Sequence, residues 1–363
     1  MSTQPRQRGR QGSGTTKRVT LADVARRAGV SPTAASFVLT GRREEMRIST
    51  EVEGRVLRAA RDMGYRPNIV SRSLRTGTTH TLGFISDTIA TTPFAGNLIK
   101  GALEAARDRD HLLLIAETEG DPRLGQELLE AMVDRQVDGI VLASMYTRRL
   151  AVPKLLKSRA AVLLNAVPAR PARLISVIPD ELAAGRTAAE TLIAAGHRDG
   201  IYLVGAGPKP NQGPKPAGGV AAVERLEGIK AAFRDAGLKA AGAVACVEWQ
   251  PELGYAAVHK LIEQGAKLRA LICFNDRLAL GAYNALADAG LAVPSDVSVV
   301  SFDDDPIASW VQPQLTTIAI PHYELGRKSI ELLLDGPPSA DVAGEKIFRI
   351  PMPLRQRASV REG

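Results

Sequence analysis

The chain has 363 residues, 45% of them hydrophobic and 24% charged, which is enough for two or three domains with buried cores. No stretch approaches the roughly 18–20 consecutive apolar residues of a membrane span, and no apolar region follows the basic N-terminus as in a secretory signal, so we expect a cytoplasmic protein without a membrane partner. The net charge of +8 is uneven: residues 1–79 hold 16 Lys and Arg against 6 Asp and Glu, whereas the rest holds 31 against 33, which indicates a polyanionic partner for the N-terminal part.

The N-terminal part divides into a tail and a helical region. Residues 1–18 are rich in Gly, Ser, Thr, Gln and Arg and lack apolar periodicity, so we expect a disordered basic tail. Short helical patterns follow from Val19 to about Leu74, and residues 75–80 have the composition of a linker.

Residues 20–39 have the pattern of a helix–turn–helix unit. Thr20 can cap a first helix, with Asp23 near its positive end, and apolar residues recur at helical spacing from position 21 to position 28. Gly29 supplies the turn between the helices. Ser31 caps the second helix and Pro32 takes its first position, where the missing N–H costs nothing.

The second helix of this unit presents small polar side chains on its outer side. Ala35 is expected to be buried, with Val38 and Leu39 on the same face. The side chains placed to meet base edges in a DNA major groove are then Pro32, Thr33 and Ser36, with Phe37 at the edge.

A third helix is expected from Ser49 or Thr50 to Met63. Its predicted packing face consists of Val52, Val56, Leu57 and Ala60. Pro67 ends the helical geometry, because the residue before a proline is disfavoured in a helix. Residues 69–75 are long enough for one further short helix.

From position 81 the chain alternates between short apolar runs and longer amphipathic segments. The apolar runs are residues 82–85, 112–116, 139–143, 161–165, 175–178, 201–205, 243–249, 270–274 and 297–302. The amphipathic segments are residues 96–109, 125–136, 183–195, 224–236, 251–264 and 276–289. Alternation of this kind predicts parallel sheets covered by helices on both faces, and the number of runs fits two sheets. The Pro-rich residues 208–219 interrupt the pattern as a surface insertion.

The order of several motifs resembles the LacI family of transcriptional regulators. The N-terminal motifs are VTLADVARRAGVS at 19–31, RISTEVEGRVLRAARDMGYRPN at 47–68 and IVSRSLRTG at 69–77. The later motifs are CFNDRLALG at 273–281, VPSDVSVVSFDD at 293–304, with Ser301 in place of the family's Gly, and PQLTTI at 313–318. The resemblance runs from Val19 almost to Ser359.

The resemblance implies a multidomain chain. An all-α helix–turn–helix DNA-binding headpiece would be followed by a two-lobed α/β core with parallel sheets, like that of periplasmic binding proteins. We place the DNA-binding domain at residues 19–67 and a hinge helix with its linker at 68–79. The first lobe then takes residues 80–179 and 321–340, and the second lobe residues 180–320 and 341–363.

The resemblance also implies which residues contact DNA. Leu74 would be the hinge leucine that enters the minor groove at the centre of the operator; as an alternative, it is an ordinary apolar linker residue. The expected DNA-binding residues are Thr20, Ser31, Pro32, Thr33, Ser36, Phe37, Asn68, Ser71 and Leu74. The family usually carries Thr-Val-Ser-Arg where this chain has Ala34-Ala35-Ser36-Phe37. Because Phe37 cannot make the bidentate guanine contact of an Arg, we expect a different base preference.

By the same resemblance, an effector binds in the cleft of the core, where residues after strand ends face the ligand. The expected effector-binding residues are Phe94, Asn165, Asp180, Arg225, Trp249, Asn275 and Asp303. Arg225 would offer a guanidinium fork and Trp249 a ring to stack on a sugar or base. Core packing of Trp249, a salt bridge of Arg225 with Glu224 or Glu227, and a solvated turn at Asp303 stay open as alternatives.

Two departures leave the effector class open. Ile320 replaces a residue that is often polar in relatives, and the Pro-rich insertion lies just before Arg225. A sugar is the first expectation, followed by a nucleoside or another small polar metabolite. Release of DNA by the effector and promotion of DNA binding are both consistent with the sequence.

Nothing in the sequence predicts catalysis, a cofactor or a metal site. The five histidines show no metal-ligand spacing, and nucleophile-elbow, Walker and dinucleotide-binding motifs are absent from the sequence. Cys246 and Cys273 are expected to be small buried hydrophobes. We therefore expect a transcriptional regulator, and members of the family it resembles are most often repressors. It would bind a pseudo-palindromic double-stranded DNA operator as a homodimer. The alternative is a small-molecule binding protein without specific DNA function, which would leave the basic first 79 residues unexplained.

Overall fold

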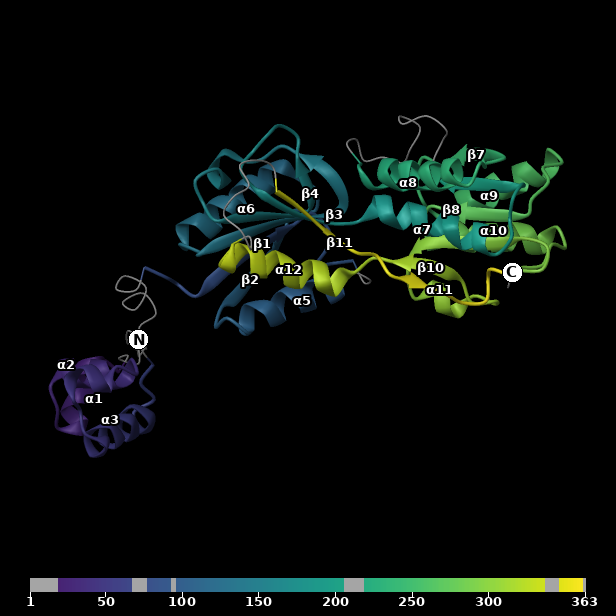
Figure 1. The fold of residues 1–363 in the computed structure, drawn as a ribbon. Coiled ribbons are helices and arrows are strands. Elements are labelled where there is room, and N and C mark those ends of the chain that lie inside the picture. Colours follow the sequence, from purple (N-terminus) through teal and green to yellow (C-terminus); the bar gives the residue numbers. More distant parts are fainter. Residues whose placement is uncertain (1–18, 67–76, 93–95, 206–218, 337–345, 362–363) are drawn as a thin grey trace, which may run out of the picture. The chain divides into compact units, whose positions relative to one another are not determined.

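The structure, a computed structural model, describes residues 19–66, 77–92, 96–205, 219–336 and 346–361. The chain forms two compact units that meet in sequence at Thr79 and His80, the headpiece and the core (Figure 1). No described helix is both long and apolar enough to cross a membrane.

The headpiece is a small helical unit. Its elements are α1 (Leu21–Ala28), α2 (Pro32–Leu39), the short 3-10 helix η1 (Arg43–Met46) and α3 (Thr50–Asp62). Val24, Ala35 and Val56 bring one buried side chain from each α-helix into a common core. The predicted packing face of α3 is wrong at Leu57, which is 43% exposed. Val56 precedes it and is fully buried, and one residue further along a helix the side chain points about 100° away.

The first lobe of the core is built on a fully parallel six-stranded sheet in the order β11-β5-β4-β3-β1-β2. Its strands are β1 (Thr81–Ser86), β2 (Leu112–Glu117), β3 (Gly139–Leu150), β4 (Ala161–Pro168), β5 (Ile175–Pro179) and β11 (Lys346–Ile350). One apolar cluster joins the sheet to α5 (Gly96–Arg107) and α12 (His322–Asp335). A second cluster joins it to α6 (Pro122–Asp134) and the short η3 (Lys154–Leu156).

The second lobe carries another six-stranded sheet, in the order β12-β10-β9-β8-β6-β7. Its strands are β6 (Ile201–Gly205), β7 (Gly242–Ala245), β8 (Ala270–Cys273), β9 (Ser298–Asp303), β10 (Thr316–Ala319) and β12 (Leu354–Arg355). All neighbours are parallel except β12, which is antiparallel to β10. The helices of the lobe are α7 (Glu181–Ala194), α8 (Ala221–Asp235), α9 (Pro251–Glu263), α10 (Asp276–Asp288) and the short α11 (Ile307–Trp310).

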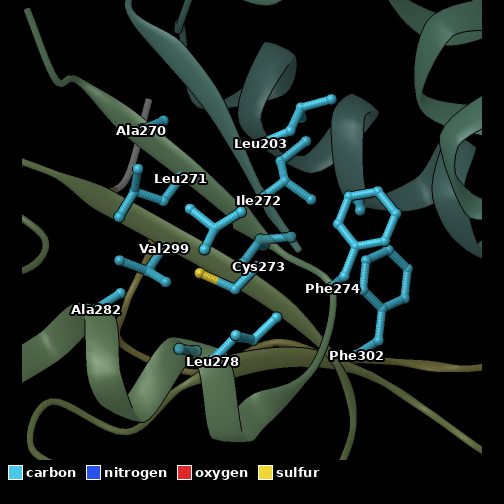
Figure 2. Packing of buried hydrophobic residues seen from close by; sticks show 14 of the residues in the cluster. Leu203, Ala270, Leu271, Ile272, Cys273, Phe274, Leu278, Ala282, Val299 and Phe302 are labelled. Carbon is cyan, nitrogen blue, oxygen red and sulfur yellow. The ribbon is translucent and has the colours of Figure 1, made fainter. Parts of the chain in front are cut away.

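The core of the second lobe is one continuous apolar cluster between its sheet and its helices. Figure 2 shows Leu278 and Ala282 of α10 packed against the strands that carry Cys273 and Val299. Cys273 and Cys246 are both buried and free, in line with the expected small hydrophobes.

The chain passes between the lobes three times: after β5, after β10 and after β11. The expected assignment of residues 341–363 to the second lobe is therefore wrong for Lys346–Ile350. This strand pairs with β5 of the first sheet, in the register Lys346↔Ile175. A five-residue strand contains no local signal for its partner, because only the tertiary pairing decides which sheet it joins.

Candidate functional site

Two of the expected DNA-binding side chains act first as helix caps. The Thr20 hydroxyl accepts a hydrogen bond from the Asp23 N–H at 3.3 Å, and the Thr20 N–H donates to the Asp23 carboxylate at 3.0 Å, which completes a capping box. Ser31 Oγ accepts from the Ala34 N–H at 3.1 Å. Both residues stand at helix N-termini, where backbone N–H groups and the helix dipole favour a phosphate.

The first turns of α2 form the exposed surface that the sequence predicts. Pro32 and Thr33 are exposed, and Ser36 and Phe37 are half-buried. The Arg42 guanidinium lies over the Phe37 ring, 5.1 Å from its centroid. Arg42 could not be predicted as part of this surface, because it lies in the turn after α2 and has no spacing signature within the helix.

Four expected site residues lie outside the described part of the chain. They are Asn68, Ser71 and Leu74 of the hinge segment and Phe94 of the cleft.

A cavity of about 550 Å³ lies in the core where the carboxyl ends of the two sheets meet. The first lobe lines it with residues after β1, on β3 and on β4, among them Thr88, Tyr146, Thr147 and Asn165. The second lobe lines it with Glu181, Arg225, Trp249, Asn275, Arg277, Asp303 and Asp305, and the β10–α12 crossing adds Ile320 and His322. Five of the seven predicted effector residues therefore line one cavity.

Arg225 is the centre of a buried ion network. Its guanidinium binds Glu181 through Nε at 2.5 Å and Nη2 at 3.1 Å, and it donates to the Phe274 carbonyl at 2.5 Å and to Asp303 at 3.3 Å. Arg225 and Glu181 are each 2% exposed. We expected the Arg225 guanidinium to be free to bind a ligand. In this structure its N–H groups instead donate to protein acceptors.

The buried network also sets the protonation of Asp303. Burial raises the pKa of Asp303 to about 6, while the neighbouring Arg225 guanidinium opposes that rise. The Asp303 backbone has a φ of 109°. Asp303 is therefore neither a solvated turn residue nor a free carboxylate, but an acceptor held at the cavity wall.

Trp249 and Asn275 are fixed by each other and by their surroundings. The Trp249 indole N–H donates to the Gly205 carbonyl at 3.0 Å, and its ring meets Phe274 edge-on at 6.0 Å between centroids. Asn275 caps α10 by accepting from the Leu278 N–H at 2.9 Å, and its amide donates to the Trp249 carbonyl at 3.2 Å. Both residues line the cavity, but each has a structural role beside any contact with a ligand.

Asn165 differs from the other cavity residues because it keeps an unused acceptor. Its side chain is 4% exposed, and Oδ1 is buried without a hydrogen-bond partner among the described residues. The backbone φ of 51° is a left-handed conformation that Asn tolerates better than most residues. A buried acceptor without a partner costs about 1–3 kcal/mol, so a donor from a ligand would relieve it.

Asp180 is the one described candidate that the structure removes from the site. Its carboxylate caps α7 by accepting from the Ala183 N–H at 3.2 Å, and it does not line the cavity. Glu181, the next residue, is the carboxylate that points inward. Sequence position alone could not separate two adjacent acids at a helix start, since one residue changes the direction of the side chain.

Asp276 holds the turn that carries Asp303 and Asp305. It is fully buried and accepts hydrogen bonds from Ser301 Oγ, from Thr317 Oγ1 at 2.8 Å and from the Asp305 N–H at 2.7 Å. Burial raises the pKa of Asp276 to about 8, and the three donors oppose that rise. Ser301, the departure from the family's Gly, is thus a direct partner of the aspartate.

Two family models match the chain. Residues 20–68 match the model described as bacterial regulatory proteins of the lacI family, and residues 189–360 match a periplasmic binding protein-like domain. The first range spans α1 to α3. The second range covers most of the second lobe together with α12 and β11 of the first lobe.

Curated relatives and solved structures resemble nearly the whole chain. The HTH-type transcriptional regulator AscG of Escherichia coli K12 is 32% identical over 91% of this chain and 95% of its own length. The ribose operon repressor of the same strain is 30% identical over 87% of this chain and 92% of its own. The structure of the Lac repressor dimer bound to operator and the anti-inducer ONPF superposes with a TM-score of 0.75 at 24% identity, over 94% of this chain and 99% of the other.

Proposed function

The chain belongs to the LacI family of bacterial regulatory proteins, and from that premise we propose a sequence-specific DNA-binding repressor that is controlled by a small molecule. The headpiece binds the operator, and the cavity between the lobes binds the effector. The observation that carries the proposal is the presence of both parts in one chain: a helix–turn–helix whose second helix exposes its first turn, and a lined cavity of about 550 Å³.

The alternative of a binding protein without DNA function does not account for the headpiece. Residues 20–68 match the regulator model, and residues 1–79 carry the chain's excess of Lys and Arg. Electrostatic attraction to phosphates supplies most of the affinity of such a unit, and the exposed side chains of α2 would supply base preference. The relatives are transcriptional regulators, and we propose the same non-catalytic role in the cytoplasm.

The charges at the cavity disfavour an anionic effector. Four carboxylates, Glu181, Glu248, Asp303 and Asp305, face only two guanidiniums, and one of these, Arg225, is saturated. Burial lowers the pKa of His322 to about 4, so its ring is neutral near pH 7. A phosphorylated ligand would be repelled, whereas hydroxyl donors would find acceptors at the carboxylates and at Asn165 Oδ1. A free sugar is the effector that these groups fit first.

Two chains are proposed to act together. A homodimer with two headpieces would read a pseudo-palindromic operator, as two-fold symmetry requires. An effector that binds one arrangement of the lobes better than another would change the affinity for the operator. Operator binding would then change the affinity for the effector by the same factor.

Selection of bound sequences from a random DNA pool tests the DNA-binding part. The full-length chain is used at 100 mM salt, without and with a panel of free sugars. Enrichment of a pseudo-palindrome supports the proposal. Failure to enrich any sequence under every condition contradicts it, because a basic but non-specific headpiece would bind all sequences alike.

Fluorescence titration tests the effector part. The chain has two Trp, Trp249 at the cavity and Trp310, which is 73% exposed, so Trp310→Phe leaves a single reporter at the cavity. In this background Asn165→Gly, which tolerates the positive φ, should weaken a bound sugar about 5–15-fold through the lost hydrogen bond. Tighter binding of the phosphorylated form of the same sugar would contradict the proposed neutral effector.

A further inference from the structure

A second basic region lies in the core, whose total charge is otherwise close to neutral. Between positions 148 and 173 the chain carries seven Arg and Lys and no Asp or Glu. Arg148 is half-buried and paired with Asp87 at 3.0 Å. The other six are exposed, and none forms an ion pair within the part of the chain that the structure describes. They are Arg149, Lys154, Lys157, Arg159, Arg170 and Arg173.

Several other arginines of the core form ion pairs. Arg109 binds Asp335 at 2.6 Å, Arg327 binds Asp108 at 3.0 Å and Arg269 binds Asp199 at 3.1 Å. What distinguishes residues 149–173 is that this segment holds six exposed cations and no Asp or Glu.

Strand register gathers three cations at one edge of the first sheet. Arg159 precedes β4 by two residues, Arg173 precedes β5 by two residues, and Lys346 begins β11. These strands are parallel neighbours in the registers Val162↔Ile175 and Ile175↔Lys346. Because adjacent strands lie about 4.8 Å apart, the starts of these three neighbouring strands span roughly 10 Å. We call Arg159, Arg173 and Lys346 the strand-start cations.

The chain enters the core from the headpiece at the same edge. Strand β1 begins at Thr81 and runs parallel to β3, which runs parallel to β4. The starts of β1, β4, β5 and β11 therefore lie at the same end of the sheet, and β1 is two places from β4 in the strand order. The acidic residue before β3, Asp138, faces His111 at 3.5 Å and is 14% exposed. Among the described residues, exposed Arg159 and Arg173 precede β4 and β5, and half-buried Lys346 begins β11 directly after Glu345, which lies outside the described part.

We propose that the strand-start cations contact the phosphates of the DNA that flanks the operator. This inference rests on the DNA-binding function proposed above. The linker tethers the headpiece, and any duplex bound to it, to this edge of the core. Duplex DNA presents one negative charge per about 1.7 Å of its axis whatever its sequence, so the contact adds affinity and salt dependence without base preference.

The test compares two duplexes that contain the operator selected from the random pool. One ends at the operator, and the other carries about ten further base pairs on each side. Dissociation constants are measured between 50 and 200 mM salt for the wild-type chain and for the triple variant Arg159→Ser/Arg173→Ser/Lys346→Ser. For the wild-type chain the log–log salt slope is expected to be steeper on the flanked duplex, by about 0.9 for each phosphate contacted.

The triple variant is expected to lose this difference in slope, by roughly one to three per chain, and to bind the short duplex as the wild-type chain does. The matched control is Arg234→Ser/Lys239→Ser/Lys260→Ser, which removes the same charge from exposed positions of the second lobe. It is expected to keep the difference in slope.

Two results would overturn the proposal. If the triple variant keeps the steeper slope, these cations do not contact flanking DNA, and an acidic protein becomes the partner to test. If the control variant loses the slope equally, the effect comes from total charge. Both results leave the regulator function intact, since that function fails only when no operator is enriched at all.

Discussion

At the scale of single residues, the cavity wall is shaped by one buried cation. Arg225 neutralises Glu181 and Asp303 and satisfies the Phe274 carbonyl, and its guanidinium lies 4.5 Å from the centroid of the Phe302 ring. A buried ion pair is costly to break from one side, because the partner keeps its charge without a counter-ion. Arg225 therefore holds Glu181 at the cavity before any effector binds.

Arg225→Met is expected to lower the free energy of unfolding by about 3–5 kcal/mol, since Glu181 stays buried and unpaired. Arg225→Met/Glu181→Leu should recover most of this loss, because apolar side chains of similar volume replace both charges. Urea denaturation at pH 7 measures the two variants against the wild-type chain. A double variant as unstable as Arg225→Met alone would show that the loss comes from packing.

His197 makes stability depend on pH in a defined direction. Its side chain is 2% exposed, with Nε2 2.9 Å from Ser298 Oγ, and burial lowers the pKa of His197 to about 4. Between pH 6.5 and 4, His197 binds a proton in the unfolded state but not in the folded state. The free energy of unfolding therefore falls as the pH falls. The stabilisation from the neutral ring is complete only above pH 6.5.

His197→Gln should remove the part of the pH dependence of stability that comes from His197. The difference in unfolding free energy between the wild-type chain and the variant is expected to shrink as the pH drops from 7.5 to 4.5, by up to about 1.4 kcal/mol per pH unit. Denaturation series at each pH provide the measurement. A difference that stays constant with pH would mean that His197 does not titrate differently in the two states.

At the scale of elements, a close contact between helices α7 and α8 positions the buried pair of Glu181 and Arg225. A Cβ atom on Gly185 of α7 would lie 2.1 Å from the Arg225 carbonyl oxygen, and one on Gly228 of α8 would lie 2.0 Å from the Leu182 carbonyl oxygen. The two helices therefore touch through their backbones. Gly185 stands one turn after Glu181, so the same contact brings Glu181 to Arg225.

Gly185→Ala is expected to push α7 and α8 apart and to lower the free energy of unfolding by about 1–3 kcal/mol. Effector affinity should fall with it, because Glu181 and Arg225 move as well. The control is Gly96→Ala on α5, where a Cβ atom meets nothing within 4 Å and which should be neutral or slightly stabilising. Thermal unfolding and Trp249 titration report the two effects, and equal behaviour of both variants would contradict the role of the contact.

The elements that the sequence predicts correctly are those with a strong local pattern. All nine apolar runs contain strands and all six amphipathic segments contain helices, although β7 ends at Ala245 and residues 246–249 are irregular. The short β10, β11 and β12 have no such pattern, because these strands of two to five residues hold too few apolar positions to form an apolar run. The same limit applies at the site: the family resemblance places Arg225 and Trp249 at the cavity, but their hydrogen bonds depend on Glu181 and Gly205, which spacing does not connect to them.

At the scale of the whole molecule, the two lobes of the core contact each other directly. Arg349 of β11 binds Glu224 of α8 through two hydrogen bonds, at 2.8 and 2.7 Å. The Val220 N–H donates to the Thr147 carbonyl at 2.8 Å beside it. We name Arg349 and Glu224 the interlobe clasp. The cavity lies between the same lobes, so the clasp stabilises the arrangement of the lobes that forms this cavity, and we expect the effector to bind that arrangement.

Arg349→Gln is expected to remove the clasp and to weaken a bound effector by up to about 5-fold, since an ion pair of this exposure contributes roughly 0–1 kcal/mol. The control is Arg327→Gln, which removes the pair with Asp108 inside the first lobe and should leave effector affinity unchanged. Titration of Trp249 in the Trp310→Phe background measures both. The ratio of effector affinities without and with operator measures the coupling between the two sites. By linkage, any change in this ratio must appear as an equal change in the ratio of operator affinities without and with saturating effector. Equal effector affinity in the two variants would mean that the clasp stabilises the fold without discriminating between arrangements of the lobes.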